Sequence, residues 1–353
     1  MSKTKIGIVG IRGLPANYGA FDQFVSQFVK YSNKNKKNLF FFISAEPNKN
    51  KIQIENVHQF YFFRGKNFFI LLNYLVSIIY FYLRGVRIFL FFGYGAVIFF
   101  PILKLLNCKI ICNVDGIEWR RNISKFKKKY FKFCEKLVAK VNVNLIFDSL
   151  VIKKYYKIRH QVDGSLLYYP SDFTNKKKVG DKIKKNEIKK AIIVMRFLPE
   201  NNISMIIDTF LELKQNHNIN DKLFIIGKEN SYFNQNIEPK IKNKSNIVFL
   251  GPIYDRNKLM EIWNSADYYI HGHSVGGTNP TLIEALSIGL PILAFNVMFN
   301  KKIIGKEGKY FSSKKDLIDL IKKKEFVDFK PHVDLEKFSE RFVNEGYLSL
   351  IKT

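Results

Sequence analysis

The residues from His271 to Pro291 have the types and spacing of an anion-binding site. They predict a buried strand, a glycine turn at 274–278 and a helix that follows Asn279. Asn279 can cap the helix with its side-chain oxygen, and Pro280 fits the first helical position, where no N–H is needed. Free amides at a helix N-terminus, next to glycines that allow close approach, can hold a phosphate.

Glu284 lies five residues after the predicted cap, on the first full turn of this helix. There its carboxylate can accept hydrogen bonds from sugar hydroxyls of the same ligand. Phosphate together with sugar indicates a nucleotide or a nucleotide sugar. The alternative is a capping box, Thr281-x-x-Glu284, in which Glu284 only closes the helix. Pro280 favours the ligand interpretation because it places the cap at Asn279 rather than at Thr281.

The run from Val275 to Ala285, VGGTNPTLIEA, resembles the donor-binding segment of the family 4 glycosyltransferases. It is most similar to their rhamnosyltransferase-like branch, whose N-terminal domain is of the DUF1972 type. The resemblance implies an α/β protein with two Rossmann-like domains facing across a cleft, the GT-B fold. In the wider family an acidic residue usually precedes the glycines. Ser274 stands near that position here, so this carboxylate contact to the donor sugar has no counterpart.

A second candidate for donor binding, Arg196, lies near the start of the predicted nucleotide-sugar-binding domain. Arg196 ends the apolar strand 191–197, where the family places an arginine that faces the donor diphosphate. Asn201 stands where a lysine is usual. The residues that the resemblance assigns to the donor are Arg196, Gly276, Gly277, Thr278, Asn279 and Glu284.

The first strand ends in a glycine-containing loop, Gly10 to Asp22. Its glycines do not have the G-x-G-x-x-G spacing, and no acidic residue ends a second strand about twenty residues on, which argues against an NAD oxidoreductase. The loop resembles the G-x-R-G-x-P-A-x-Y-G-G-F-E opening of the same branch, with Ala20 and Asp22 as departures. The alternative is a tight turn without ligand contact. The residues expected here to contact phosphate or acceptor are Arg12, Gly13, Tyr18 and Gly19.

A third segment that matches the branch, N-x-D-G-x-E-W-x-R, follows the strand predicted at 109–114. Residues just beyond the carboxyl end of such a strand line the ligand crevice of parallel sheets. Asp115 is therefore a candidate catalytic residue on the acceptor side, and Glu118 a candidate acceptor ligand. Equally, Asp115 can shape a turn with Gly116 while Glu118 caps the next helix.

The chain is strongly basic, with 58 Lys+Arg against 30 Asp+Glu and a net charge of +28. This balance indicates a polyanionic partner or, alternatively, a lysine-rich coding bias. Five lysines between Lys125 and Lys132 alternate with aromatic residues, as in helices that lie on anionic membranes. The alternative is a solvated lysine face over an aromatic core. No nucleic-acid-binding signature is present, so a membrane surface is expected and nucleic acid is not.

The three cysteines, Cys108, Cys112 and Cys134, form no metal pattern. Cys108 and Cys112 fall on an apolar strand and are expected to be buried thiols, and the protein is expected to be reduced and cytosolic. No signal peptide is evident. The apolar run 68–83 is short for a membrane span and predicts a buried or surface-dipping helix. No Asp-x-Asp pair or ligand cluster is found, so neither a metal nor another cofactor is expected.

These patterns predict four segments: an acceptor-binding domain at 1–172, a linker at 173–188, a nucleotide-sugar-binding domain at 189–332, and a helix at 333–353 that returns to the first domain. The resemblance implies a retaining hexosyltransferase. It would move rhamnose from a dTDP-sugar, or another hexose from a UDP-sugar, to a lipid-linked saccharide during surface polysaccharide synthesis. The expected location is the cytoplasmic face of the cell membrane. A nucleotide-sugar epimerase and a non-catalytic scaffold remain alternatives.

Overall fold

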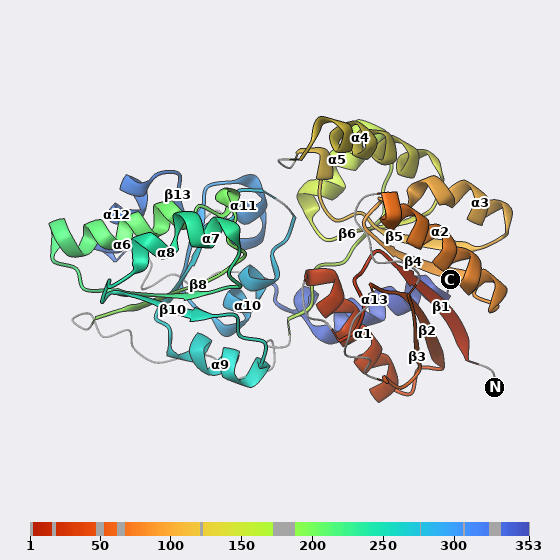
Figure 1. The fold of residues 1–353 in the computed structure, drawn as a ribbon, viewed down its shortest axis with the longest axis horizontal. Coiled ribbons are helices and arrows are strands. Elements are labelled where there is room, and N and C mark those ends of the chain that lie inside the picture. Colours follow the sequence, from red (N-terminus) through yellow and green to blue (C-terminus); the bar gives the residue numbers. More distant parts are fainter. Residues whose placement is uncertain are drawn as a thin grey trace. The chain divides into compact units, whose positions relative to one another are not determined.

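The computed structural model describes residues 3–15, 19–46, 53–61, 68–120, 123–171, 188–275, 277–305, 308–324 and 333–352. They form two compact units (Figure 1). Unit 1 comprises Met1–Pro170 and Glu340–Thr353, and unit 2 comprises Ser171–Ser339.

Unit 1 is built on a parallel sheet, which has seven strands within the described residues. In spatial order the strands are β3 (Val57–Phe60), β2 (Leu39–Ser44), β1 (Thr4–Val9), β4 (Ile88–Phe92), β5 (Lys109–Asn113), β6 (Asn144–Phe147) and β7 (Ser165–Leu166). The central strands are nearly continuous apolar runs because helices cover both faces of the sheet. The strand order reverses between β1 and β4, which is where ligands bind in sheets of this type.

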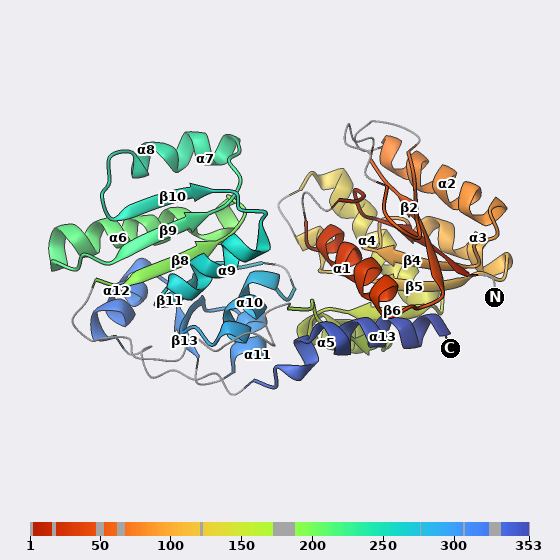
Figure 2. The same ribbon diagram turned by 90° about the horizontal axis from the view of Figure 1, so that it is seen from below.

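Helices from both ends of the chain share one face of this sheet (Figure 2). They are α1 (Ala20–Lys34) and α13 (Glu340–Lys352). The remaining helical elements of the unit are α2 (Phe68–Leu83), α3 (Phe100–Leu105), α4 (Lys125–Lys140), α5 (Leu150–His160), η1 (Val97–Phe99) and η2 (Glu118–Arg120). Aromatic pairs such as Phe42–Phe81 and Phe91–Phe100 pack α2 and α3 on the opposite face.

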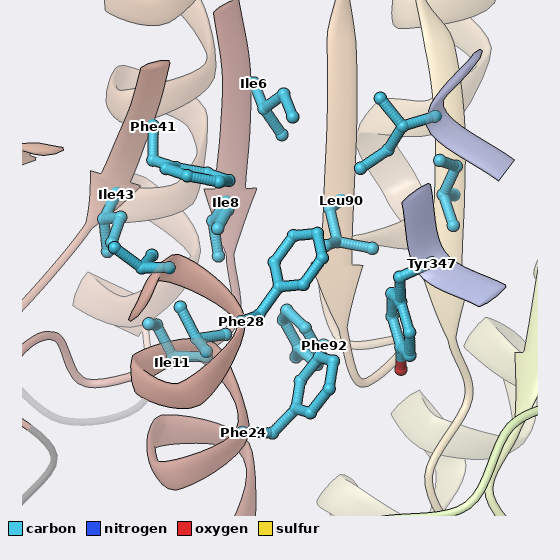
Figure 3. Packing of buried hydrophobic residues seen from close by; sticks show 14 of the residues in the cluster. Ile6, Ile8, Ile11, Phe24, Phe28, Phe41, Ile43, Leu90, Phe92 and Tyr347 are labelled. Carbon is cyan, nitrogen blue, oxygen red and sulfur yellow. The ribbon is translucent and has the colours of Figure 1, made fainter. Parts of the chain in front are cut away.

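The core beneath α1 and α13 is aromatic (Figure 3). Phe24 and Phe28 of α1 and Phe92 of β4 surround Tyr347 of α13, with the Phe24 and Tyr347 ring centroids 4.5 Å apart. These four side chains are almost completely buried. The helix at the end of the chain is therefore part of the core of unit 1.

Unit 2 repeats the architecture with six parallel strands among its described residues. In spatial order they are β10 (Ile247–Gly251), β9 (Lys222–Ile226), β8 (Lys190–Val194), β11 (Tyr268–His271), β12 (Ile292–Phe295) and β13 (Lys309–Phe311). Its helical elements are η3 (Pro199–Asn201), α6 (Ile203–His217), α7 (Ser231–Asn236), α8 (Glu238–Ile241), α9 (Arg256–Ser265), α10 (Pro280–Ile288), α11 (Met298–Ile304), α12 (Lys314–Lys323) and η4 (Glu336–Phe338). The strand order reverses between β8 and β11.

The structure confirms the predicted α/β class with two parallel sheets and places the strands close to their predicted positions. β3 and β13 were not predicted, because each has too few consecutive apolar residues. The terminal helix was expected from about Asp334 but begins at Glu340, after η4. The predicted linker at 173–188 lies outside the described residues, apart from Ile188. No helix among the described residues is both long and apolar enough to cross a membrane.

Candidate functional site

The helix α10 begins as the sequence predicts. The Asn279 side-chain oxygen accepts hydrogen bonds from the Thr281 amide, at 3.0 Å, and from the Thr281 hydroxyl, at 2.8 Å. Pro280 is the first helical residue, and Gly289 ends the helix in a left-handed conformation. Because Asn279 takes the Thr281 amide, the alternative capping box from Thr281 to Glu284 does not form.

Short polar side chains fasten the segment before α10 to η3. Ser274 donates to the Glu200 carbonyl from its amide, at 3.0 Å, and from its hydroxyl, at 2.7 Å. The Asn202 side chain donates to the Gly272 carbonyl at 2.8 Å. A Cβ at Gly272 would lie 2.3 Å from the Asn201 carbonyl oxygen, so only glycine fits. The chain after β11 is therefore fixed against the chain after β8.

Two stacked histidines lie at the end of β11, with ring centroids 4.5 Å apart. His271 Nδ1 lies 2.8 Å from the Tyr269 hydroxyl. Burial, together with the charge of nearby Arg196, lowers the pKa of His273 to about 3. Burial also lowers the pKa of His271 well below its usual value. Both rings are therefore neutral near pH 7, and the positive charge at this edge of the sheet comes from Arg196.

The other predicted donor residues lie at the same end of unit 2. Arg196 is exposed after β8, and Asn201 donates its side-chain amide to the Arg196 carbonyl at 2.7 Å. The Thr278 hydroxyl is buried without a hydrogen-bond partner among the described residues. A buried polar group of this kind calls for a partner beyond the described residues. Gly277 is partly buried in the turn, and Gly276 lies outside the described residues.

Glu284 has a protein partner that the sequence did not reveal. Its Oε1 accepts a hydrogen bond from Arg256 Nη1 at 2.8 Å, and its side chain is only 9% exposed. Arg256 is the first residue of α9, after the cap Asp255. The carboxylate thus belongs to an ion pair, which fixes its orientation next to the start of α10. No local pattern identifies a partner 28 residues away.

In unit 1 the loop after β1 is held by a buried carboxylate. Asp22, in the first turn of α1, accepts the Arg12 amide at 2.7 Å and also a backbone hydrogen bond from Gly13. Burial, the largest effect, raises the pKa of Asp22 to about 6. Gly13 has φ 116°, and a Cβ there would lie 2.7 Å from the Ala45 Cβ. Gly19, with φ 104°, precedes α1.

The predicted ligand side chains of this loop are less constrained. The Arg12 side chain is 59% exposed, with Nε 3.9 Å from Glu46 Oε1. Tyr18 lies outside the described residues. The contacts of Arg12, Gly13, Tyr18 and Gly19 with a phosphate or acceptor stay predictions.

The segment after β5 turns at Asp115, which has φ 61°. The Asp115 amide donates to Asn113 Oδ1 at 3.0 Å, and the Glu118 amide donates to the Tyr94 hydroxyl at 2.9 Å. Asp115 thus shapes a turn, as the alternative interpretation proposed, and Glu118 starts η2 rather than capping α4, whose cap is Ser124. The contacts of the two carboxylates with an acceptor stay predictions.

Trp119, the next residue, is anchored by Glu135 of α4. Trp119 Nε1 donates to Glu135 Oε2 at 2.6 Å. The other oxygen accepts from the Tyr155 hydroxyl at 2.8 Å and lies 2.8 Å from His160 Nε2. Glu135 is 3% exposed, so a buried carboxylate joins η2, α4 and α5. Sequence reasoning missed Glu135 because it lies within the lysine-rich helix.

The described residues hold no group of three or more His, Cys, Asp or Glu side chains that could bind a metal. Cys108 and Cys112 are buried and free, as predicted, and so is Cys134. The site residues fall into two sets, one at the ends of β8 and β11 in unit 2, the other at the ends of β1 and β5 in unit 1.

Solved structures with this fold are glycosyltransferases and related enzymes. Sucrose-phosphate synthase from Thermosynechococcus elongatus matches with a TM-score of 0.79 and 12% identity, over 99% of this chain and 98% of that one. HepE from Anabaena, in complex with UDP and glucose, matches with a TM-score of 0.73 and 10% identity, over 99% of this chain and 100% of HepE. A glycosyltransferase from Rickettsia africae matches with a TM-score of 0.70 and 15% identity, over 100% of this chain and 98% of that one. The fold is therefore GT-B.

The sequence families agree with the fold. Residues 174–330 match the family model of glycosyl transferases group 1, and residues 3–77 and 73–172 match DUF1972, a domain of unknown function. The second half of the chain therefore belongs to the group 1 glycosyl transferases, and the first half is a DUF1972 domain. Protein CapJ of Staphylococcus aureus is 27% identical over 173 residues, which span 49% of this chain and 44% of CapJ.

Proposed function

We propose that this protein transfers a hexose, with retention of anomeric configuration, from a nucleotide sugar bound by unit 2 to an acceptor bound by unit 1. The observation that carries the proposal is the turn before α10, where the buried Thr278 hydroxyl and the positive end of the helix dipole lie at the switch point between β11 and β8, the strand that Arg196 follows. Helix N-termini and arginine both bind phosphate well. HepE, a structural neighbour, was solved with UDP and with UDP-glucose.

The same groups provide the chemistry that the transfer requires. Breaking the bond between sugar and diphosphate leaves negative charge on the departing phosphate. Donors aimed at this charge lower the barrier. Arg196 supplies a full positive charge, and α10 supplies the positive end of its dipole. The neutral histidines add no competing charge. We therefore expect turnover to continue in saturating EDTA, and a requirement for Mg²⁺ or Mn²⁺ would contradict this assignment.

The proposed donor is dTDP-rhamnose, and the proposed acceptor is a lipid-linked saccharide of a surface polysaccharide. Support comes from the VGGTNPTLIEA segment, which resembles the rhamnosyltransferase-like branch. Glu284, whose carboxylate is oriented by Arg256, is proposed to accept hydrogen bonds from donor hydroxyls. Asp115 is proposed to act on the acceptor.

A panel of nucleotide sugars tests the proposal. We expect dTDP-rhamnose, or one UDP-hexose, to raise the melting temperature most, because a ligand that binds the folded state stabilises it. Release of free nucleotide should require an added acceptor, and the product should keep the donor's anomeric configuration. A nucleotide-sugar epimerase would convert the donor without an acceptor. A scaffold would neither convert the donor nor release nucleotide.

A membrane-bound acceptor requires that the protein reach an anionic membrane, and unit 1 has a suitable surface. On α4, Phe126 is 80% exposed and Phe133 is 55% exposed, among exposed lysines. Other aromatic residues of α4 face inward: Phe131 packs on Tyr94, and Tyr130 donates to the Gly95 carbonyl. Further exposed apolar side chains lie on α2 and α3, including Ile79, Leu83, Ile102 and Leu105. We propose that this surface seats unit 1 on the inner face of the cell membrane.

Vesicle cosedimentation tests the membrane proposal. Binding should be stronger to anionic than to neutral vesicles and should fall with salt, because charges are screened beyond about 10 Å at 0.1 M ionic strength. Replacing Lys127, Lys128 and Lys129 by Glu should reduce it. The matched control replaces three lysines of α12 in unit 2: Lys315, Lys322 and Lys323. Equal loss in both triple variants would indicate net charge alone, and no loss in either would exclude α4 as the contact.

A further inference from the structure

The turn at Asp115 adopts a conformation that needs support. Its φ of 61° lies in the left-handed region, which residues with a side chain seldom occupy. Such a conformation persists where surrounding contacts determine it, and it is found often at functional sites. The direct support is Asn113, whose side-chain oxygen accepts the Asp115 amide at 3.0 Å. The position of Asp115 thus depends on the side chain of Asn113.

Asn113 is fixed in turn by the last helix of the chain. Its side-chain nitrogen donates to the Tyr347 hydroxyl at 2.7 Å, across 234 positions of sequence. Asn113 is 2% exposed and Tyr347 is also 2% exposed. A flipped amide would turn its nitrogen toward the Asp115 amide, donor against donor, so the bond to Asp115 requires the observed orientation. The Tyr347 hydroxyl holds the buried Asn113 side chain where its oxygen reaches Asp115.

Tyr347 itself has little freedom. Phe24, Phe28 and Phe92 pack around its ring, and its hydroxyl points toward the carboxyl ends of the strands (Figure 3). Burial raises the pKa of Tyr347 above its usual value, so the hydroxyl stays neutral at any physiological pH. A rigid, neutral hydroxyl is suited to hold an amide in one orientation.

We propose that Tyr347 is a positioning residue for the acceptor side, so that α13 completes the turn on which Asp115 lies. This inference rests on the proposed function of Asp115, and it concerns the hydroxyl rather than the ring. The attachment of α13 does not depend on that hydroxyl. The Tyr31 hydroxyl donates to Glu345 Oε1 at 2.8 Å, Lys37 pairs with Glu345 at 2.9 Å, and Lys109 donates to the Ile351 carbonyl at 3.2 Å.

The test compares Tyr347→Phe with Tyr31→Phe in the full chain. Each variant removes one hydroxyl that bonds α13 to the rest of unit 1, but only the Tyr347 hydroxyl is connected to Asp115 through hydrogen bonds. Hydrogen exchange of the Asp115 amide should rise about tenfold in Tyr347→Phe, the factor for one net hydrogen bond, and stay unchanged in Tyr31→Phe. Exchange that stays unchanged in Tyr347→Phe, or rises equally in both variants, overturns the proposal.

Kinetics with an acceptor then separate positioning from general stability. Tyr347→Phe should lower kcat or raise the acceptor KM by about five- to tenfold while donor affinity stays unchanged. An equal effect of Tyr31→Phe would indicate loss of helix attachment and would contradict the proposal. The exchange measurement needs no substrate. If the wild-type protein transfers no sugar, the proposed function fails, while the link from Tyr347 to Asp115 is still tested on its own.

Discussion

The turn that precedes α10 in unit 2 and the turn at Asp115 in unit 1 lie at corresponding places, beyond the carboxyl ends of parallel strands, yet they are fixed in different ways. The first is held by Ser274 and Asn202, short side chains that donate to backbone carbonyls of the neighbouring loop. The second depends on buried side chains from distant segments, Tyr347 and Tyr94. One turn is built within two adjacent loops, the other by the core of its unit.

This difference suggests what each turn tolerates. A backbone carbonyl is present whatever the side chain of its residue. The donor turn should therefore keep its conformation after most substitutions outside its own two loops. The acceptor turn should respond to substitutions in α4 and α13, which need not touch any ligand. The predictions below test this contrast, in order of decreasing expected effect.

Gly277→Val should have the largest effect. The added side chain would stand where a diphosphate approaches the amides before α10, and losing one such donor typically lowers kcat by about 100- to 1000-fold. Turnover and dTDP or UDP binding should fall together, while thermal unfolding stays close to that of wild type. Normal nucleotide binding by Gly277→Val would place the diphosphate elsewhere.

The next prediction concerns pH, and comparison with a variant isolates the contribution of one acceptor-side group, Asp22. The folded-state pKa of Asp22, about 6, exceeds the ordinary value of 3.8. The folded state therefore binds the proton more tightly, and this stabilisation is complete below about pH 3.8 and lost as the pH rises through 6. Relative to Asp22→Asn, the wild-type free energy of unfolding should fall by up to about 3 kcal/mol between pH 4 and 7.

Chemical denaturation of both proteins at several pH values measures this difference. Asp163→Asn is the control, because the hydrogen bond from the Gly164 amide and the partner Lys153 lower the pKa of exposed Asp163 to about 2. Its difference from wild type should stay constant above pH 4. A constant difference for Asp22→Asn as well would mean that its carboxyl is ionised across this range.

The two turns also differ in how far the sequence foretells them. The α10 cap and its proline form one local pattern, and both have the predicted roles. The strands follow from apolar runs. By contrast, Tyr347, Glu135 and Arg256 reach their partners through the folded chain, and no spacing rule specifies such contacts. The stacking of His271 on His273 could have been predicted, because residues two apart on a strand share a face.

On the donor side, Glu284 is held differently from the turn before α10, because its orientation depends on Arg256, a side chain from another helix. Arg256→Met should weaken donor binding by about 1.5–3 kcal/mol, as should Glu284→Gln, and the two effects should not add. The control is Lys240→Met, which breaks an ion pair of equal length, 2.8 Å, with Asp208 in the same unit. Unchanged donor affinity with a lower melting temperature would make the Arg256–Glu284 pair purely structural.

The smallest effect is expected from Trp119→Phe, which keeps an aromatic ring but removes the N–H that Glu135 accepts. One lost hydrogen bond contributes about 1 kcal/mol, so the acceptor KM should rise by about fivefold while donor affinity stays unchanged. The chain has two tryptophans, and the other provides the control. Trp263 is buried in α9, and its indole nitrogen has no hydrogen-bond partner among the described residues. Trp263→Phe should therefore leave the acceptor KM unchanged. If both substitutions alter it equally, the effect comes from packing, and the acceptor turn does not depend on Glu135.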